Sequence, residues 1–258
     1  MRIKIVLAYT GTQYSGWQIQ AKPNPPKTIQ NELEKALSTL SGKKIKTYAS
    51  GRTDAGVHAL YQVIHCDVPE NRNPLSWLGK LNSILPYDIR VMNLEETNSS
   101  FHARKDAINK TYMYQFWQER HFAPPQILPF VWNCGKLDIK KIRKALPYFI
   151  GEHDFSSLQN TGTDLETTIR TIYEIKIKTI KQLEFCPKHL PLVRLIVTAN
   201  GFLKQMVRNI AGLLVYIGQD KLQIKDVPNL LNMKNRKSLP SMTAPASGLF
   251  LINVNYKE

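Results

Sequence analysis

The stretch GRTDAGVHA (residues 51–59) lies between two apolar runs, residues 45–49 and 60–68. Each run is short and contains β-branched or aromatic residues, so each predicts a strand. Gly51 and Gly56 bracket the segment between them, and glycine lets a backbone turn sharply or come close to a ligand. The sequence therefore predicts a loop carried between two strands.

Three ionisable side chains lie on this loop: Asp54, Arg52 two residues before it, and His58 four residues after it. Many enzymes carry their reactive groups on a short loop supported by a rigid sheet. The same residues also fit an ordinary tight loop, in which the aspartate caps a turn and the arginine neutralises it. An imidazole at this spacing more often bonds the backbone, and we interpret His58 as structural.

The composition is that of a globular protein with a polyanionic partner. Of the 258 residues 43% are hydrophobic, which is enough for a sizeable core and argues against disorder. The 35 Lys and Arg against 20 Asp and Glu give a net charge of +15. Such a charge favours a polyanion but does not distinguish RNA from DNA or an anionic membrane, and solvated lysines would also explain it. Basic residues cluster at Lys43, Lys44, Lys46, Arg104, Lys105, Lys140, Lys141, Arg143, Lys144, Lys234, Arg236 and Lys237.

Neither a membrane segment nor a metal site is predicted. No run approaches the ~18 apolar residues of a membrane helix. Residues 1–5 alternate as a strand does, without the apolar core of a signal peptide. The cysteines Cys66, Cys134 and Cys186 form no CxxC pair, and Cys186 with His189 supplies too few ligands for a metal. We therefore expect a cytoplasmic protein with reduced thiols and no metal.

Hydrophobic periodicity predicts the element order of the first half. Residues 2–9 alternate as a strand, and residues 29–40 carry apolar side chains at helical spacing. The two strands around GRTDAGVHA follow, then a helix over residues 74–86 and a strand over residues 89–94. This order, strand-helix-strand-strand-helix-strand, is that of a ferredoxin-like unit.

The order recurs in the second half. The same periodicity predicts strands and helices at residues 110–117, 137–150, 171–180, 192–198, 202–217 and 249–256. We therefore predict an α+β fold of two ferredoxin-like units, residues 1–100 and residues 105–258. Their sheets would fuse edge to edge into one large antiparallel sheet with helices on one face, and the active-site cleft would lie between the units.

Two further stretches contain residues that a reaction could use. KTYMYQF puts Tyr112, Tyr114 and Phe116 on one strand face, either as an aromatic core or as a platform for an unstacked base. In GFLKQMVRNI (residues 201–210), Arg208 lies opposite the apolar arc of the predicted helix. Solvation alone would explain an arginine in that position.

The motifs together resemble the TruA family of tRNA pseudouridine synthases. GRTDAGVHA resembles the family signature, in which Asp54 is the catalytic aspartate. KTYMY is similar to the second motif, which implies that Tyr112 is the active-site tyrosine, and FLKQMVRNI is similar to the third, whose arginine, here Arg208, pairs with the aspartate. Arg52 resembles the arginine that helps displace the target base. Further matches, in the family's order, are YSGWQ at residues 14–18, FHAR at 101–104, GEHDF at 151–155 and APASGL at 244–249.

The resemblance implies a reaction and a substrate. The substrate would be the anticodon stem-loop of tRNA, at uridines 38 to 40, and the enzyme would be a homodimer without metal or cofactor. The N1–C1′ bond of uridine breaks, the base turns, and C5 joins C1′. Asp54 could attack the sugar, attack the base or assist departure through a glycal, and the sequence leaves these open. Arg208 would keep the aspartate charged, Tyr112 would stack on the base and assist removal of the C5 proton, and Arg52 would help displace the base.

Three other functions share some of these sequence features. A related synthase of the eukaryotic type would act on other tRNA positions. A non-catalytic RNA-binding protein of two ferredoxin-like units should carry a Lys/Arg-Gly-Phe-Gly-Phe-Val type motif, which is absent from the sequence. A glycoside hydrolase needs a second carboxylate, and none occurs in the matched motifs. Residues 182–192 match no motif of the family.

Overall fold

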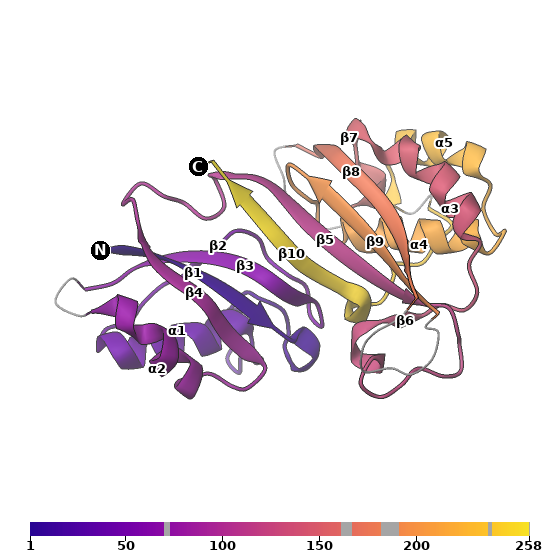
Figure 1. Cartoon of the computed structure of the whole chain (residues 1–258). Coiled ribbons are helices and arrows are strands. Elements are labelled where there is room, and N and C mark those ends of the chain that lie inside the picture. Colours follow the sequence, from indigo (N-terminus) through magenta and orange to yellow (C-terminus); the bar gives the residue numbers. More distant parts are fainter. Residues whose placement is uncertain (70–72, 161–166, 182–190, 237–238, 258) are drawn as a thin grey trace. The chain divides into compact units, whose positions relative to one another are not determined.

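The computed structural model describes residues 1–69, 73–160, 167–181, 191–236 and 239–257 (Figure 1). The Cys186 and His189 pair, and most of the segment 182–192, lie outside these ranges. Within them no helix is long and apolar enough to cross a membrane. The chain forms two compact units, Met1–Ile108 with Phe250–Glu258 and Asn109–Leu249, called here the first and the second unit.

The first unit has the predicted element order. Its elements are β1 (Arg2–Tyr9), α1 (Ile29–Ser41), β2 (Tyr48–Ala49), β3 (His58–Asp67), α2 (Trp77–Ile84), β4 (Ile89–Thr97) and β10 (Leu249–Tyr256). The strands run in the order β4-β1-β3, antiparallel, with β2 and β10 both on the other edge of β3. The helices α1 and α2 lie side by side on one face of this sheet (Figure 1). The ferredoxin-like order predicted for the first half is confirmed.

Sequence alternation explains how this sheet buries its core. Ile3, Ile5 and Leu7 have no exposed surface, and their cross-strand partners on β3 include Ile64 and Cys66, which are equally buried. These side chains therefore share one face of the sheet, the face that packs against helices, because strand residues two apart point the same way.

Local capping signals fix the first helix where the sequence predicted it. Thr28 caps α1, because its side chain accepts a hydrogen bond from the Asn31 N–H at 3.4 Å. Gly42 ends the helix in the left-handed conformation, with φ of 71°.

The last strand was assigned to the wrong half. Residues 249–256 were predicted to close the second unit, but from Phe250 onward β10 groups with the first unit. The reason is its backbone pairing: Phe250 and Leu251 run parallel to His58 and Ala59 of β3.

The second unit has strands in the order β5-β9-β8-β7, with β6 paired to β5. Its elements are β5 (Ala107–Trp117), β6 (Trp132–Asn133), α3 (Ile139–Ala145), β7 (Gly151–Asp154), β8 (Ile169–Ile180), β9 (Leu192–Ala199), α4 (Met206–Gly218) and α5 (Val227–Asn232). Short 3-10 helices in the two units are Gly11–Gln13, Pro74–Ser76, Leu128–Phe130, Leu146–Phe149, Ser156–Leu158, Ile224–Asp226 and Ala246–Gly248. The short strands β6 and β7 were not predicted.

Two predicted helices are shorter than expected. The helix predicted over residues 137–150 is α-helical only to Ala145 and continues as a 3-10 turn, because Pro147 lacks the N–H that an α-helix requires. The helix predicted from residue 202 begins at Met206, because Gln205 before it has a left-handed φ of 63°.

Both units combine a sheet with helices, so the predicted α+β class is confirmed. The joining of the two sheets and the cleft between the units stay predictions.

Candidate active site

The loop that carries Asp54 connects β2 to β3 and is called here the aspartate loop, residues 51–57. It contains a β-turn in which the Val57 N–H donates to the Asp54 carbonyl at 3.1 Å. Gly56, the third residue of that turn, has φ of 78°, as a type II turn requires. Asp54 is partly exposed and Arg52 is exposed.

A buried polar network lies beneath the aspartate loop. Gln62 of β3, which has no exposed surface, donates through Nε2 to the Gly51 carbonyl at 2.9 Å. Its Oε1 accepts from the Ser50 hydroxyl at 2.7 Å. The hydroxyls of Tyr9 and Thr53 lie 2.8 Å apart, and burial raises the pKa of the Tyr9 phenol to about 12. These bonds fix both the start and the middle of the loop.

The YSGWQ segment holds the aspartate loop from the other side. The Trp17 N–H donates to the Thr53 carbonyl at 3.0 Å, and the Gly56 N–H donates to the Tyr14 carbonyl at 3.3 Å. Gly16 has φ of 91°, and a Cβ there would lie 2.7 Å from the Thr53 oxygen. Only glycine therefore fits at this close approach of the two loops.

His58 has the structural role that was predicted for it. Its ring is 1% exposed and stacks on Phe250, with ring centroids 4.6 Å apart. Its Nδ1 accepts the Gly11 N–H at 3.2 Å. A side chain at Gly11 would overlap the Val57 carbonyl. The backbone at Gly11 therefore packs directly against the end of the aspartate loop.

Tyr112 and its neighbours on β5 form a buried aromatic row in the second unit. Tyr112 is 8% exposed and meets Phe202 edge to face, with centroids 5.0 Å apart. Tyr114 and Phe116 have no exposed surface. The Tyr114 hydroxyl donates to the Pro245 carbonyl at 2.8 Å, and burial raises the pKa of this phenol well above its ordinary value. The aromatic-core interpretation is therefore right for Tyr114 and Phe116.

Arg208 lies in the first turn of α4 and is clamped to the chain segment before β10. Its Nε donates to the Ala244 carbonyl at 2.7 Å, and the Ala244 N–H donates back to the Arg208 carbonyl at 3.2 Å. The helix has no broad solvated face, because most of its residues are buried. The partly buried guanidinium is therefore held in place and is not simply solvated.

Further contacts tie this segment to the same helix. Asn209 is fully buried, donates through Nδ2 to the Leu158 carbonyl and accepts the Thr243 hydroxyl, both at 2.7 Å. A Cβ on Gly212 would overlap the Met242 carbonyl. Sequence reasoning missed Asn209, although a polar residue within an apolar helix was a possible signal.

The APASGL segment also fixes the aromatic row. A Cβ on Gly248 would lie 2.7 Å from the Tyr114 ring, so glycine lets the chain pass directly over the ring. The Ser247 hydroxyl donates to the Val131 carbonyl at 3.1 Å. This one segment therefore contacts both the helix of Arg208 and the strand of Tyr112.

The predicted site residues fall into two pairs. Arg52 and Asp54 lie on one loop of the first unit, and Tyr112 and Arg208 lie in the second unit. In the part of the chain that the structure describes, no group of three or more His, Cys, Asp or Glu side chains could hold a metal ion.

Comparison with known proteins identifies the family of these motifs. The family described as "tRNA pseudouridine synthase" matches residues 5–104 and 145–257. The chain belongs to this family of tRNA pseudouridine synthases. The matched ranges contain the aspartate loop and α4, whereas Tyr112 lies between them.

Individual members of the synthase family match over the whole chain. "tRNA pseudouridine synthase A" of Maridesulfovibrio salexigens is 44% identical over 257 residues, covering 100% of this chain and 91% of the relative. The protein of the same name from Lawsonia intracellularis is 45% identical over 258 residues, covering 99% of each chain. A solved structure, "Crystal Structure of a Cbf5-Nop10-Gar1 Complex", matches at 14% identity with a TM-score of 0.34, over 83% of this chain and 45% of its own. The last likeness is too distant to bear on function.

Proposed function

We propose that this synthase converts uridine to pseudouridine at positions 38 to 40 of the tRNA anticodon stem-loop, with Asp54 as its catalytic group. The observation that carries the proposal is the construction of the aspartate loop. Gln62 and the glycine of YSGWQ hold its backbone, Tyr9 holds the side chain of Thr53, and Asp54 is partly exposed. A catalytic group that must reach one carbon atom of a large substrate requires such preorganisation.

The reaction conserves all atoms of the substrate. The N1–C1′ bond breaks, the uracil turns within the pocket, a C5–C1′ bond forms, and C5 loses its proton while N1 gains one. An ionised Asp54 can start the reaction by attack on the sugar, by attack on the base or by assisting a glycal. All three need the carboxylate in its charged form, and a nearby guanidinium favours that form. We assign this role to Arg208, whose Nε is already bound to Ala244 and whose orientation is therefore fixed.

Arg52 and Tyr112 complete the proposed site. Arg52 is exposed on the aspartate loop, as a side chain that displaces a base from its stack has to be. Phe202 meets Tyr112 edge to face and so fixes the plane of the Tyr112 ring. In the proposed site this ring stacks on the target base. Tyr112 would also assist removal of the C5 proton.

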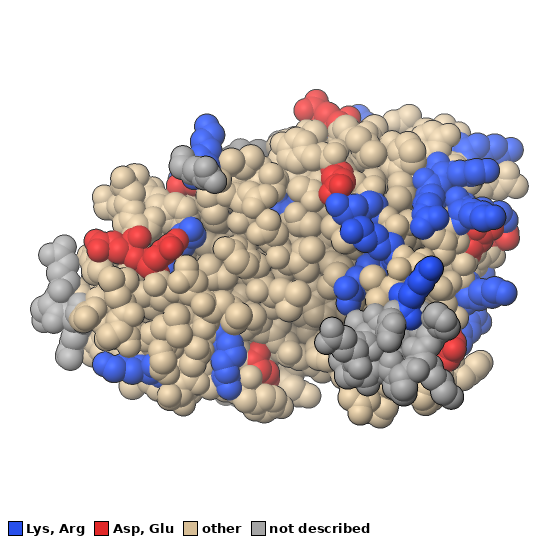
Figure 2. All heavy atoms as spheres, in the orientation of Figure 1, with Lys and Arg blue, Asp and Glu red and all other residues tan. Residues whose placement is uncertain are grey.

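The substrate and the assembly are supported by charge and by the resemblance to the family. The net charge of +15 suits a polyanion, and Lys and Arg side chains gather over α3 on the face shown in Figure 2. Binding should weaken steeply with salt as counterions are released. We also propose that the enzyme is a homodimer. It would act in the cytoplasm on the anticodon stem-loop.

Release of tritium tests the reaction. Transcripts of tRNA carry uridine tritiated at C5, and pseudouridine formation releases that tritium to water. We expect release with the wild type and none with Asp54→Asn, while both proteins bind tRNA equally. A wild type that binds all tRNAs and releases no tritium would refute the synthase and favour a non-catalytic RNA-binding protein.

The position that is modified distinguishes the nearest alternative. Mapping pseudouridine along the reacted tRNA should place it at positions 38 to 40. Modification elsewhere in the tRNA would instead indicate a synthase of the eukaryotic type.

A further inference from the structure

A strip of exposed side chains leads along the chain toward the aspartate loop. Lys44, Lys46 and Tyr48 are exposed, whereas Ile45 and Thr47 between them are 5% and 3% exposed. Strict alternation of this kind puts the three exposed side chains on one side of an extended backbone. They span about 13 Å, since an extended chain rises ~3.3 Å per residue.

The buried residues of the strip anchor it to α1. The Thr47 N–H and hydroxyl both donate to Oε1 of Glu34, at 2.8 and 2.9 Å. The Ile45 N–H donates to the hydroxyl of Ser38 at 3.1 Å. The exposed side chains are therefore presented on a backbone that is already ordered, so a ligand need not pay the entropy of ordering it.

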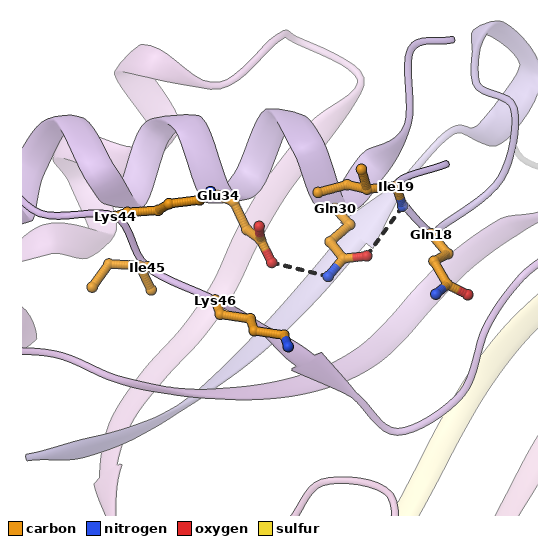
Figure 3. A pocket seen from close by; sticks show the side chains of 7 residues that line it. All are labelled: Gln18, Ile19, Gln30, Glu34, Lys44, Ile45 and Lys46. Carbon is orange, nitrogen blue, oxygen red and sulfur yellow. Dashed lines mark hydrogen bonds between the residues drawn. The ribbon is translucent and has the colours of Figure 1, made fainter. Parts of the chain in front are cut away.

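A hollow of about 540 Å³ lies between this strip and α1 (Figure 3). Amide and ammonium groups dominate its polar lining, and Ile19 supplies a partly exposed apolar wall. The residues that line it include Gln18, Ile19, Gln30, Glu34, Lys44 and Lys46.

The charges of the hollow favour an anion. Neither Lys44 nor Lys46 forms an ion pair with any described residue, whereas Lys4 and Lys35 are each paired with a glutamate. The Lys46 ammonium lies 5.4 Å from the centre of the Tyr48 ring, a contact that leaves its N–H groups available. The carboxylate in the lining, Glu34, already accepts hydrogen bonds from Thr47 and Gln30.

The hollow is continuous with the aspartate loop along the chain. Gln18 directly follows Trp17, whose N–H holds the Thr53 carbonyl at 3.0 Å. At the other end of the strip, Tyr48 begins β2, and Arg52 follows four residues later. The hollow is therefore joined to the aspartate loop by only a few residues of chain at each end.

We propose that the strip and the hollow bind the RNA strand next to the target uridine, through its phosphodiester backbone. Lys44 and Lys46 each neutralise one phosphate of that strand. The proposal rests on the proposed function, because the RNA is the enzyme's own substrate. It assigns substrate binding to residues outside the four-residue site.

The test removes both charges and measures binding apart from chemistry. We expect the double variant Lys44→Gln/Lys46→Gln to raise the Kd for tRNA and the KM roughly fivefold or more, with kcat unchanged. The slope of log K against log salt should fall by about 1.4 to 1.8, because two phosphate contacts are lost. The matched control is Lys80→Gln/Lys225→Gln, which removes two exposed positive charges that form no ion pair with any described residue.

A third variant should act in the opposite direction. Glu34→Gln keeps the oxygen that accepts from Thr47 but removes the negative charge, so we expect the Kd for tRNA to fall about twofold. A purely structural role for this residue predicts no gain in affinity. Circular dichroism and thermal melting check that the fold is kept.

The outcomes separate this proposal from the proposed function. If the lysine variant has the same Kd and salt slope as the control, or if Glu34→Gln weakens binding, the strip does not hold RNA. If the wild type binds tRNA with these charge effects but releases no tritium, the strip stands and the synthase reaction is refuted.

Discussion

Replacing Gln62 by leucine should separate positioning of the aspartate loop from general stability. Leucine has a similar volume, so no large cavity forms. The Gly51 carbonyl loses the donor that lies at 2.9 Å, and the Ser50 hydroxyl loses the acceptor at 2.7 Å. A buried polar group deprived of its partner costs about 1–3 kcal/mol, so we expect the free energy of unfolding to fall by about 2–4 kcal/mol. For a chain of this size the Tm should fall by about 5–15 °C.

The same variant should lose activity well below its melting temperature. A displacement of about 1 Å at a reacting group costs roughly 100-fold in rate, so a loop freed from Gln62 should lower kcat at least ~10-fold. Urea titration measures the stability, and tritium release at 20 °C under saturating tRNA measures kcat.

A core variant with the same loss of stability serves as the control. Leu81 of α2 is fully buried, and Leu81→Ala should cost about 2–5 kcal/mol by leaving a cavity away from the loop. We expect its kcat to match the wild type. If Gln62→Leu is destabilised as expected but keeps a kcat equal to that of Leu81→Ala, the network does not position the aspartate loop.

Two further predictions concern a glycine and a histidine. A Cβ on Gly212 would overlap the Met242 carbonyl, so Gly212→Ala should destabilise the protein by about 1–3 kcal/mol and lower kcat by shifting the segment that holds Arg208. Gly79→Ala is the control, since nothing lies within 4 Å of its Cβ, and it should be neutral or stabilising in urea titrations. Burial lowers the pKa of His65 to about 4, so the native state stays neutral while the unfolded state takes up a proton. The free energy of unfolding should therefore decline as the pH falls from about 6.5 to about 4, and a His65→Gln variant that declines equally would contradict this cause.

The sequence predicted those parts of the fold that depend on neighbouring residues. Thr28 and Gly42 bound α1 because a cap and a left-handed stop act within one turn of the helix. The partner of β10 could not be predicted in this way, since its pairing with β3 joins residues far apart in the chain. The start of α4 was also missed, because the left-handed Gln205 has no signal in its residue type.

The sequence indicates only part of the candidate site, for the same reason. Asp54 and Arg208 were placed by motifs, and the structure adds how each backbone is held. Gln62 and Asn209 were missed, because their function lies in buried partners such as the Gly51 carbonyl that periodicity does not reveal. A polar residue within a strand or helix is most often exposed, and only its surroundings in the fold show that it is a support.

YSGWQ and APASGL supply no group to the proposed reaction, but they hold the segments that carry the proposed catalytic side chains. The aspartate loop is held by the close approach of Gly16, and the helix of Arg208 is held by Ala244. A carboxylate or guanidinium on an unsupported loop would sample many positions, and each would cost rate, because a catalytic group must stay within about 0.5 Å of its productive geometry. In the proposed mechanism, YSGWQ and APASGL would therefore act on the reaction through backbone contacts. Substitutions there should lower kcat more than they weaken the binding of tRNA.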